Sequence, residues 1–154
     1  MRQLIIMRHA RAEAGNGKPD FDRALEPRGW HEAEDVGAAL IAAGLLPDTV
    51  LCSAARRTRD TLAAILPRLS GNCTISLMAE IYHADAAGLR TILGHATGQT
   101  VLLIGHNPSV HGLALALAGT SADAIGHNFP TSSAAVFTVG FGLDTAVFQR
   151  LLTP

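Results

Sequence analysis

The order of apolar and polar positions along the chain predicts short strands that alternate with helices. Compact apolar runs rich in β-branched residues are typical of strands, and apolar positions three and four residues apart are typical of helices. These patterns predict strands at 3–7, 49–52, 74–78 and 100–104. They predict helices at 28–43, 53–67 and 86–95, and a fourth helix of about eleven residues that begins at Pro108. Two alternating segments, 133–140 and 146–152, are separated by Gly142 and predict a closing β-hairpin.

Strands that alternate with helices indicate an α/β fold, a three-layer sandwich in which helices flank a mostly parallel central sheet. The run 100–104 is apolar at every position, which is typical of a strand covered on both faces. No repeat, low-complexity segment or linker divides the chain, so we expect one domain over 1–154. The polar segment 8–27 is predicted to be a loop.

Capping residues predict where two of the helices begin. Ser53 is a good N-cap for the helix that follows the second strand. Asn107 can cap the helix that follows the strand 100–104, with Pro108 at its first position. The free amides at the start of that helix favour an anion beside the strand ends.

Length and composition exclude several classes of protein. The 154 residues are 48% hydrophobic and 16% charged, which excludes intrinsic disorder. The apolar stretches are shorter than the roughly 20 residues of a membrane-spanning helix, and no secretory leader follows Met1. A net charge of −1 argues against a nucleic-acid partner, and two cysteines are too few for a disulfide scaffold. We therefore expect a cytoplasmic protein that binds neither a membrane nor nucleic acid.

The basic residues are unusual, because eleven are arginine and Lys18 is the only lysine. Two interpretations are a composition bias of the genome and bidentate recognition of an oxyanion. The positions of the arginines help to separate them, because ligands of an open α/β sheet bind at the carboxyl ends of its strands. The residues that follow three of the predicted strands are Arg8 and His9, then Ser53 with Arg56, Arg57 and Arg59, and then Gly105, His106 and Asn107.

Two histidines and several arginines are therefore expected at one edge of the sheet, where His9 has three candidate roles. A metal ligand needs well-spaced partners, and His106 and His111, five residues apart, are poorly placed on one helix face. A general base needs a nucleophile, and no Ser or Cys nucleophile is evident nearby in the sequence. A nucleophilic His9 attacking phosphorus uses the whole cluster, because the arginines keep its ring neutral and neutralise the phosphoryl oxygens.

Two other phosphate chemistries do not fit the spacing of the residues. A cysteine phosphatase needs an arginine six positions after its cysteine, and Thr58 stands at that distance from Cys52. We therefore expect Cys52 to be a buried strand residue. A phosphate-binding loop needs a lysine directly after its glycine motif, and Lys18 follows no such motif.

The segments at the predicted strand ends resemble the motifs of the histidine phosphatase (phosphoglycerate mutase-like) superfamily. Leu4–Ala10 resembles its Arg-His-Gly signature, Ser53–Thr61 its Ser-Pro-x-x-Arg-Ala-x-Gln-Thr motif, and Gly105–Pro108 its late Gly-His motif. The chain is similar to the SixA-like branch of this superfamily in its short length, in the segment 131–133 and in one further pattern. The SixA-like branch removes phosphate from phosphohistidine in signalling proteins. The further pattern comprises Asp20, Arg23, Leu25 and Gly29.

The resemblance implies a role for each residue of the cluster. His9 is the expected nucleophile, which becomes phosphorylated during the reaction. Arg8, Arg57 and His106 are expected to hold the phosphoryl group, with help from Asn107. Arg57 is preferred to its neighbours because the motif places its arginine four residues after the serine.

The general acid is less well defined by the resemblance. Many members of the superfamily use a glutamate after the third strand, and Glu80 stands at that place, with Asp85 as an alternative. A phosphohistidine leaving group needs less help from an acid, so a third alternative is that none is used. The chain departs from the motifs at Ala10, Ala54 and Asp60, which replace Gly, Pro and Gln.

The resemblance thus implies a phosphatase that needs no cofactor or metal and forms a covalent intermediate on His9. The expected substrate is a protein that carries phosphohistidine. Two alternatives stay open, a phosphatase for small phosphomonoesters and a weakly catalytic module that binds phosphate and other proteins.

Overall fold

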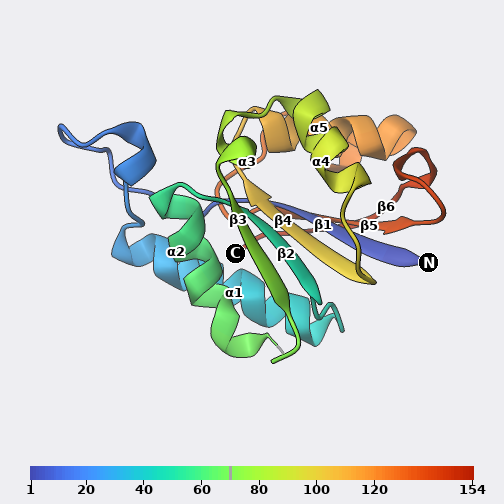
Figure 1. The fold of residues 1–154 in the computed structure, drawn as a ribbon, viewed down its shortest axis with the longest axis horizontal. Helices are drawn as coiled ribbons and strands as arrows, with labels where there is room; N and C mark the ends of the chain where they lie inside the picture. The colour runs from blue at the N-terminus through green and yellow to red at the C-terminus, as the bar shows by residue number, and fades with distance from the viewer. Residues whose placement is uncertain (70) are drawn as a thin grey trace.

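The computed structural model describes residues 1–69 and 71–154 and contains a six-stranded sheet in the order β3-β2-β4-β1-β5-β6 (Figure 1). Strands β3, β2, β4 and β1 are parallel to one another, whereas β5 is antiparallel to β1 and β6 to β5. This confirms the mostly parallel sheet and the closing C-terminal hairpin. The strands are β1 (Arg2–Arg8), β2 (Thr49–Ser53), β3 (Thr74–Met78), β4 (Thr100–Gly105), β5 (Ala134–Val139) and β6 (Val147–Leu152).

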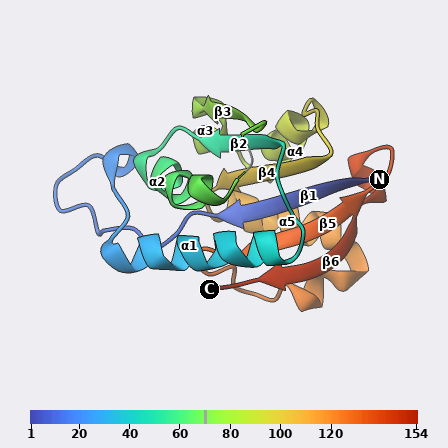
Figure 2. The same ribbon diagram turned by 90° about the horizontal axis from the view of Figure 1, so that it is seen from below.

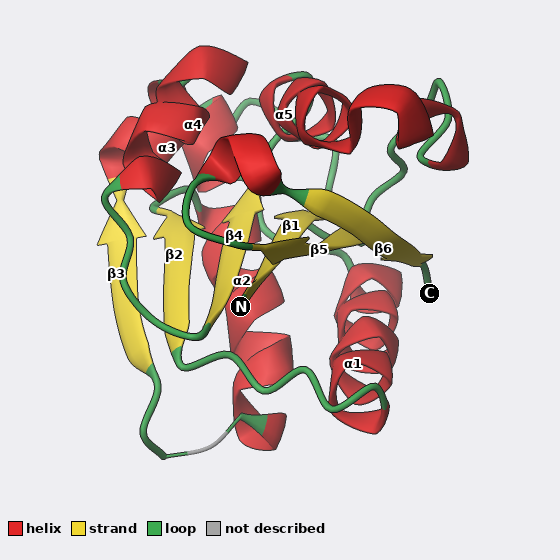
Figure 3. Ribbon diagram, turned by 90° about the vertical axis from the view of Figure 1, so that its right-hand side faces the viewer, coloured by secondary structure: helices red, strands yellow, loops and turns green. Residues whose placement is uncertain are grey.

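Helices cover both faces of the sheet, so the predicted three-layer α/β sandwich is confirmed (Figures 2 and 3). One face carries α1 (Pro27–Ala42) and α2 (Arg56–Ile65), and the other carries α3 (Ala79–His83), α4 (Ala86–Gly94) and α5 (Ser109–Ala118). None of the helices in the described parts of the chain is long and apolar enough to cross a membrane. Short 3-10 helices are η1 (Asp20–Asp22), η2 (Leu66–Arg68), η3 (Gly119–Ala124) and η4 (Leu143–Thr145).

An apolar core fills the space between the sheet and each layer of helices. Strand β1 contributes Leu4 and Ile6 to the core that includes residues of α4 and α5. It contributes Ile5 and Met7 to the core that includes residues of α1 and α2. Because successive side chains of a strand point to opposite faces, an uninterrupted apolar run supplies both cores.

The register of the parallel strands aligns their carboxyl ends at one edge of the sheet. Arg8 at the end of β1 pairs with Gly105 at the end of β4. Ser53 at the end of β2 pairs with Met78 at the end of β3. The segments that follow these strands therefore lie side by side, at the edge where α/β sheets bind their ligands.

The predicted start of α2 is wrong. The helix begins at Arg56 rather than after Ser53, and Ala55 precedes it as the N-cap residue without a side-chain cap. The Ser53 hydroxyl instead contacts the ring of His106 at 2.8 Å and accepts a hydrogen bond from the Ala55 amide at 3.3 Å. The serine therefore links β2 to the segment after β4.

The predicted start of α5 is wrong by one residue. Pro108 is the N-cap residue and Ser109 is the first residue of the helix. The Asn107 side chain does not cap the helix, because its Nδ2 donates to the carbonyl oxygen of Phe129 at 2.9 Å.

Two further elements are absent from the sequence prediction. The segment between β1 and α1 projects from the body of the molecule and is largely irregular, but it contains η1 and a bridge between Ala12 and Leu25 (Figures 1 and 2). The helix α3 occupies the interval between β3 and α4. Its five residues are too few to show a helical repeat of apolar positions.

Candidate active site

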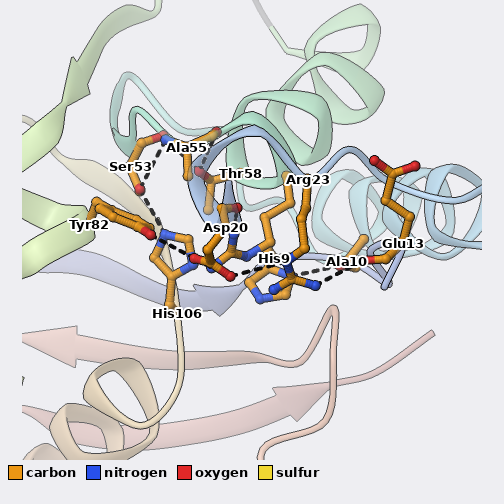
Figure 4. A network of polar contacts seen from close by, with 11 residues as sticks. His9, Ala10, Glu13, Asp20, Arg23, Ser53, Ala55, Thr58, Tyr82 and His106 are labelled. Atoms are coloured by element: carbon orange, nitrogen blue, oxygen red, sulfur yellow. Dashed lines mark hydrogen bonds and ion pairs between the residues drawn. The ribbon is translucent and has the colours of Figure 1, made fainter. Parts of the chain in front are cut away.

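His9 directly follows β1 at the carboxyl edge of the sheet. Its backbone N–H donates to Gly105 O at 3.0 Å, which ties it to the end of β4. Its ring nitrogen Nδ1 lies 2.7 Å from the carbonyl oxygen of Ala10 (Figure 4). Because a carbonyl oxygen only accepts hydrogen bonds, the proton of the neutral ring lies on Nδ1. The lone pair of the neutral ring is therefore on Nε2.

The surroundings of His9 keep its ring neutral. The residue is 7% exposed, and burial is the main reason why the pKa of His9 falls from 6.5 to about 3. The charges of His106, Arg57 and Arg8 lower the pKa as well, whereas the hydrogen bond to Ala10 raises it. At neutral pH, Nε2 is unprotonated and has the electron pair that a nucleophile requires.

His106 directly follows β4 and lies next to His9. The centroids of the two rings are 5.4 Å apart, and Nε2 of His106 lies 2.8 Å from the Ser53 hydroxyl. Burial, followed by the charge of Arg57, lowers the pKa of His106 to about 4, so this ring is also neutral at neutral pH. Its Nδ1 is buried and makes no hydrogen bond with the residues that the structure describes.

Arg8 and Arg57 are held in similar ways by backbone carbonyl groups of different segments. Arg8 Nη1 donates to Phe129 O at 3.1 Å, and Arg57 Nη1 donates to Asp20 O at 2.9 Å. In both residues Nε is buried and makes no hydrogen bond within the described parts of the chain. Each guanidinium group is thus anchored at a terminal nitrogen while its buried Nε–H has no partner among the described residues. Asn107 also donates to Phe129 O, which places its amide beside Arg8.

Asp20 links the projecting segment to the cluster. Its Oδ2 lies 3.1 Å from Arg57 Nη2 and accepts a hydrogen bond of 2.6 Å from the Tyr82 hydroxyl. Its Oδ1 accepts a hydrogen bond of 3.0 Å from Arg23 Nε, as the labelled side chains in Figure 4 illustrate. The hydrogen bond from Tyr82 and the charge of Arg57 lower the pKa of Asp20 to about 2, so it is a carboxylate at neutral pH.

Two side chains of α2 fix the surrounding backbone. The Thr61 hydroxyl accepts a hydrogen bond from the Ala10 amide at 2.9 Å and donates to Arg57 O at 2.7 Å. The carboxylate of Asp60 accepts a hydrogen bond from the Leu25 amide at 3.1 Å. Helix α2 therefore connects Ala10, the residue after His9, with Leu25, near the end of the projecting segment.

Ser132 supports the backbone of His9 from the other side. Its N–H donates to His9 O at 3.0 Å, and its hydroxyl is buried without a hydrogen-bond partner in the described parts of the chain. Its φ of 67° is in the left-handed region, which disfavours residues with a Cβ atom. Such strained backbone is concentrated at functional sites.

A comparison with protein families identifies the group to which these residues belong. The model of the histidine phosphatase superfamily (branch 1) matches residues 4–89, more than half of the chain. The chain belongs to the histidine phosphatase superfamily. An uncharacterised protein of Mycobacterium tuberculosis is 37% identical over 142 residues, covering 86% of this chain and 87% of the relative.

Solved structures confirm the resemblance to the SixA-like branch of the histidine phosphatase superfamily. A proposed phosphohistidine phosphatase SixA from Agrobacterium tumefaciens is similar with a TM-score of 0.87 and 31% identity, over 99% of this chain and 98% of the other. The protein histidine phosphatase SixA complexed with tungstate has a TM-score of 0.86 at 24% identity, over 99% and 97% of the two chains. The latter similarity shows the shared fold.

The two carboxylates considered as the general acid of this histidine phosphatase are not part of the polar cluster. Glu80 is exposed in the first turn of α3 and makes no hydrogen bond or ion pair with the other described residues. Asp85 caps α4, where its Oδ1 accepts a hydrogen bond from the Gly88 amide at 2.8 Å. The carboxylate that does join the cluster is Asp20.

Metal and cysteine chemistry were both considered from the sequence. The described residues contain no group of three or more His, Cys, Asp or Glu side chains arranged to hold a metal ion. Cys52 is fully buried in β2, as expected, and burial raises the pKa of its thiol to about 12. An activated cysteine has the opposite shift in pKa.

Sequence reasoning missed the contacts of three residues of this histidine phosphatase. The sequence identifies Asp20 only as part of a family pattern and Ser53 only as a helix cap at a strand end, and it assigns no contact to Tyr82. The spacing of Asp20 and Arg23 could have suggested an ion pair, because residues three apart on one turn are neighbours. The contact of Asp20 with Arg57 depends on the path of the projecting segment, which has no periodic pattern to predict it.

Proposed function

We propose that this chain is a phosphohistidine phosphatase that transfers the phosphoryl group of its substrate to Nε2 of His9. The observation that carries this proposal is the hydrogen bond from His9 Nδ1 to Ala10 O at 2.7 Å. That bond fixes the tautomer, and burial holds the pKa of His9 at about 3, so Nε2 presents a lone pair at neutral pH.

In the first step, the Nε2 lone pair of His9 attacks phosphorus and forms an N–P bond. The bond between phosphorus and the substrate nitrogen breaks, and its electron pair stays on the substrate ring. His9 keeps its Nδ1 proton, which continues to donate to Ala10 O. The phosphorylated His9 ring is therefore cationic, and it is a good leaving group for the second step.

The positive groups around His9 stabilise the transferred phosphoryl group. Arg8 and Arg57 each present an Nε–H that has no partner among the described residues. His106 adds a third donor when the Ser53 hydroxyl donates to its Nε2, because its proton then lies on Nδ1. Donors fixed in advance around the developing negative charge lower the barrier to phosphoryl transfer.

In the second step, water attacks phosphorus and the N–P electron pair returns to Nε2 of His9. The products are phosphate and a neutral His9 ring, and the water proton leaves with phosphate or to solvent. Both leaving groups are nitrogen rings that depart without a negative charge if they are protonated at their other nitrogen. This chemistry therefore does not require Glu80 or Asp85 as an acid.

The similarity to SixA-like phosphohistidine phosphatases supports a phosphorylated histidine side chain as the substrate. The polar cluster also lies at an open edge of the sheet, where the Asp20 side chain is 54% exposed. A side chain of another protein can reach such a site without a closing lid.

The proposal is tested with a peptide that carries radiolabelled phosphohistidine. The wild-type protein is expected to release phosphate and to retain acid-labile label on the protein during turnover. His9→Ala is expected to show neither, because it removes the attacking nitrogen. A phosphoserine peptide measured in parallel tests the preference for a nitrogen leaving group.

A control variant is His95→Ala, which removes an exposed histidine at the end of α4. We expect it to keep the wild-type rate and labelling. Undiminished hydrolysis by His9→Ala would disprove the covalent route. Tight phosphate binding by a wild-type protein that turns over neither peptide would instead support a phosphate-binding module.

A further inference from the structure

Asp20 places a carboxylate at the mouth of a site whose other groups are positive or neutral. The side chain of Asp20 is 54% exposed, whereas that of Arg57, its partner at 3.1 Å, is 7% exposed. The carboxylate thus has one side towards the buried cluster and one side towards solvent. It comes from the projecting segment, and Tyr82 donates to it from α3 at 2.6 Å.

Asp20 does not use all the donors of Arg57. The bonds from Nη1 to Asp20 O and from Nη2 to Oδ2 occupy one hydrogen on each terminal nitrogen. The Nε–H of Arg57 makes no hydrogen bond with any described residue. Asp20 therefore leaves donors of Arg57 unused, so a phosphoryl group that binds Arg57 need not displace the carboxylate.

The ring of Tyr82, whose hydroxyl holds Asp20, contacts two further aromatic rings. The Tyr82 ring meets Phe21 edge to face at a centroid distance of 4.9 Å and meets His106 edge to face at 5.4 Å. The mouth of the site therefore combines a carboxylate with flat aromatic surfaces. This combination binds a cationic ring, because a carboxylate attracts its charge and aromatic faces stack on it.

The leaving group of phosphohistidine is such a ring. In an in-line displacement by His9 Nε2, the leaving group departs on the side of phosphorus remote from His9. A phosphohistidine ring protonated at its second nitrogen is cationic, and it departs as neutral imidazole once the P–N electron pair returns to the ring. A nearby carboxylate stabilises the protonated form of this ring.

We propose that Asp20, held by the Tyr82 hydroxyl, selects protonated nitrogen rings as leaving groups over oxygen leaving groups. This inference rests on the proposed function and assigns the substrate preference to one residue outside the phosphoryl-binding cluster. Asp20 acts on the leaving group, and Arg8, Arg57 and His106 act on the phosphoryl group.

The variant Asp20→Asn tests this assignment. Its side-chain oxygen can still accept from Arg57, and the backbone contact between Arg57 and residue 20 remains, so the change chiefly removes the negative charge. We expect kcat/KM for phosphoimidazole to fall about 10-fold or more, as for the loss of a charge-assisted hydrogen bond. We expect kcat/KM for p-nitrophenyl phosphate, whose leaving group is an oxygen anion, to change less than about 3-fold.

The matched control is Asp22→Asn, which removes a carboxylate from the same 3-10 turn. Asp22 makes no side-chain hydrogen bond or ion pair with the described residues, so both substrates should be turned over as by wild type. Tyr82→Phe keeps the ring and removes the donor to Asp20. It is expected to shift the ratio of the two kcat/KM values in the same direction as Asp20→Asn, by a smaller factor.

Each outcome distinguishes one explanation. If Asp20→Asn lowers kcat/KM equally for both substrates, the proposal is overturned, and the role of Asp20 is only to position Arg57. If Asp20→Asn raises kcat/KM for both substrates, the proposal is also overturned, because Asp20 then competes with the phosphoryl group for Arg57. If wild type turns over p-nitrophenyl phosphate through His9 but not phosphoimidazole, the proposed function fails and the selection by Asp20 falls with it.

Discussion

Arg57 and Arg59 both lie in the first turn of α2 but are held differently. Arg57 is 6% exposed, and both of its terminal nitrogens donate to Asp20. Arg59 is exposed, and its Nε donates to the backbone oxygen of Ala54 at 3.0 Å. A lysine provides a compact ammonium in place of a planar guanidinium, so it cannot reproduce several directed hydrogen bonds at once.

We therefore expect Arg57→Lys to lower kcat/KM for a phosphohistidine peptide about 100-fold, as for the loss of one oriented donor to a developing anion. Arg59→Lys should change kcat/KM less than about 3-fold, because a surface contact contributes little. Steady-state kinetics of both variants, with circular dichroism to check folding, measures this difference. Similar losses in the two variants would contradict the special role of Arg57.

The neighbourhood of Arg8, His9 and His106 could be predicted because each residue directly follows an apolar run. Parallel strands in register end at the same edge of the sheet. The residues that directly follow them therefore lie close together, whatever conformation the loops adopt. The Asp20 carboxylate could not be placed in this way, because it lies on a largely irregular segment twelve residues beyond the end of β1. Ser53 was misplaced because a serine that precedes a helix is a cap in most contexts, and here its hydroxyl contacts a histidine.

At the scale of elements, the projecting segment is anchored where it returns to α1. The backbone of Arg11 lies so close to Gly29 that a Cβ atom at Gly29 would overlap the Arg11 carbonyl oxygen. That oxygen accepts a hydrogen bond from the Glu26 amide at 3.1 Å, and the side chains of Arg11 and Glu26 form an ion pair. Gly29 therefore allows the close approach that fixes the base of the segment carrying Asp20.

Gly29→Ala is expected to destabilise the protein by roughly 2 kcal/mol, because the overlap is with backbone and cannot be relieved by a side-chain rotation. Gly112→Ala is a matched control within α5, where a Cβ atom would meet only the Ala86 Cβ at 3.4 Å. We expect that variant to be as stable as wild type or more stable by up to about 1 kcal/mol. Urea unfolding of both variants tests the contrast, and a neutral Gly29→Ala would show that the contact is easily rearranged.

The strands and the longer helices could be predicted because each has a clear apolar pattern. Strands β1 and β4 are continuous apolar runs, and α1 shows apolar positions at helical spacing. The short α3 and η1 could not be predicted, because three to five residues complete little more than one turn. These two elements are held by tertiary contacts, among them the hydrogen bond between Tyr82 and Asp20.

At the scale of the whole molecule, the fold buries two neutral histidines that titrate freely once the chain unfolds. The pKa of His9 is about 3 and that of His106 about 4 in the folded protein, against an ordinary value of 6.5. At pH values below 6.5 and above these two folded pKa values, the two histidines bind protons in the unfolded chain but not in the folded protein. The free energy of unfolding is therefore undiminished by these two rings above pH 6.5 and falls as the pH drops from 6.5 towards 4.

We expect the wild-type protein to lose stability between pH 6.5 and pH 4.5 by up to about 1.4 kcal/mol per pH unit for each of the two rings. His9→Asn removes one of the two rings. It should reduce the slope of unfolding free energy against pH by the contribution of one proton, up to about 1.4 kcal/mol per pH unit, whatever its effect on stability at pH 7.5. His95→Asn, which replaces an exposed histidine, should keep the wild-type slope. Urea unfolding across this range measures the slopes. A His9→Asn slope equal to that of wild type would mean that His9 takes up its proton in the folded protein as readily as in the unfolded chain, and would remove the basis for a neutral nucleophile fixed by the fold.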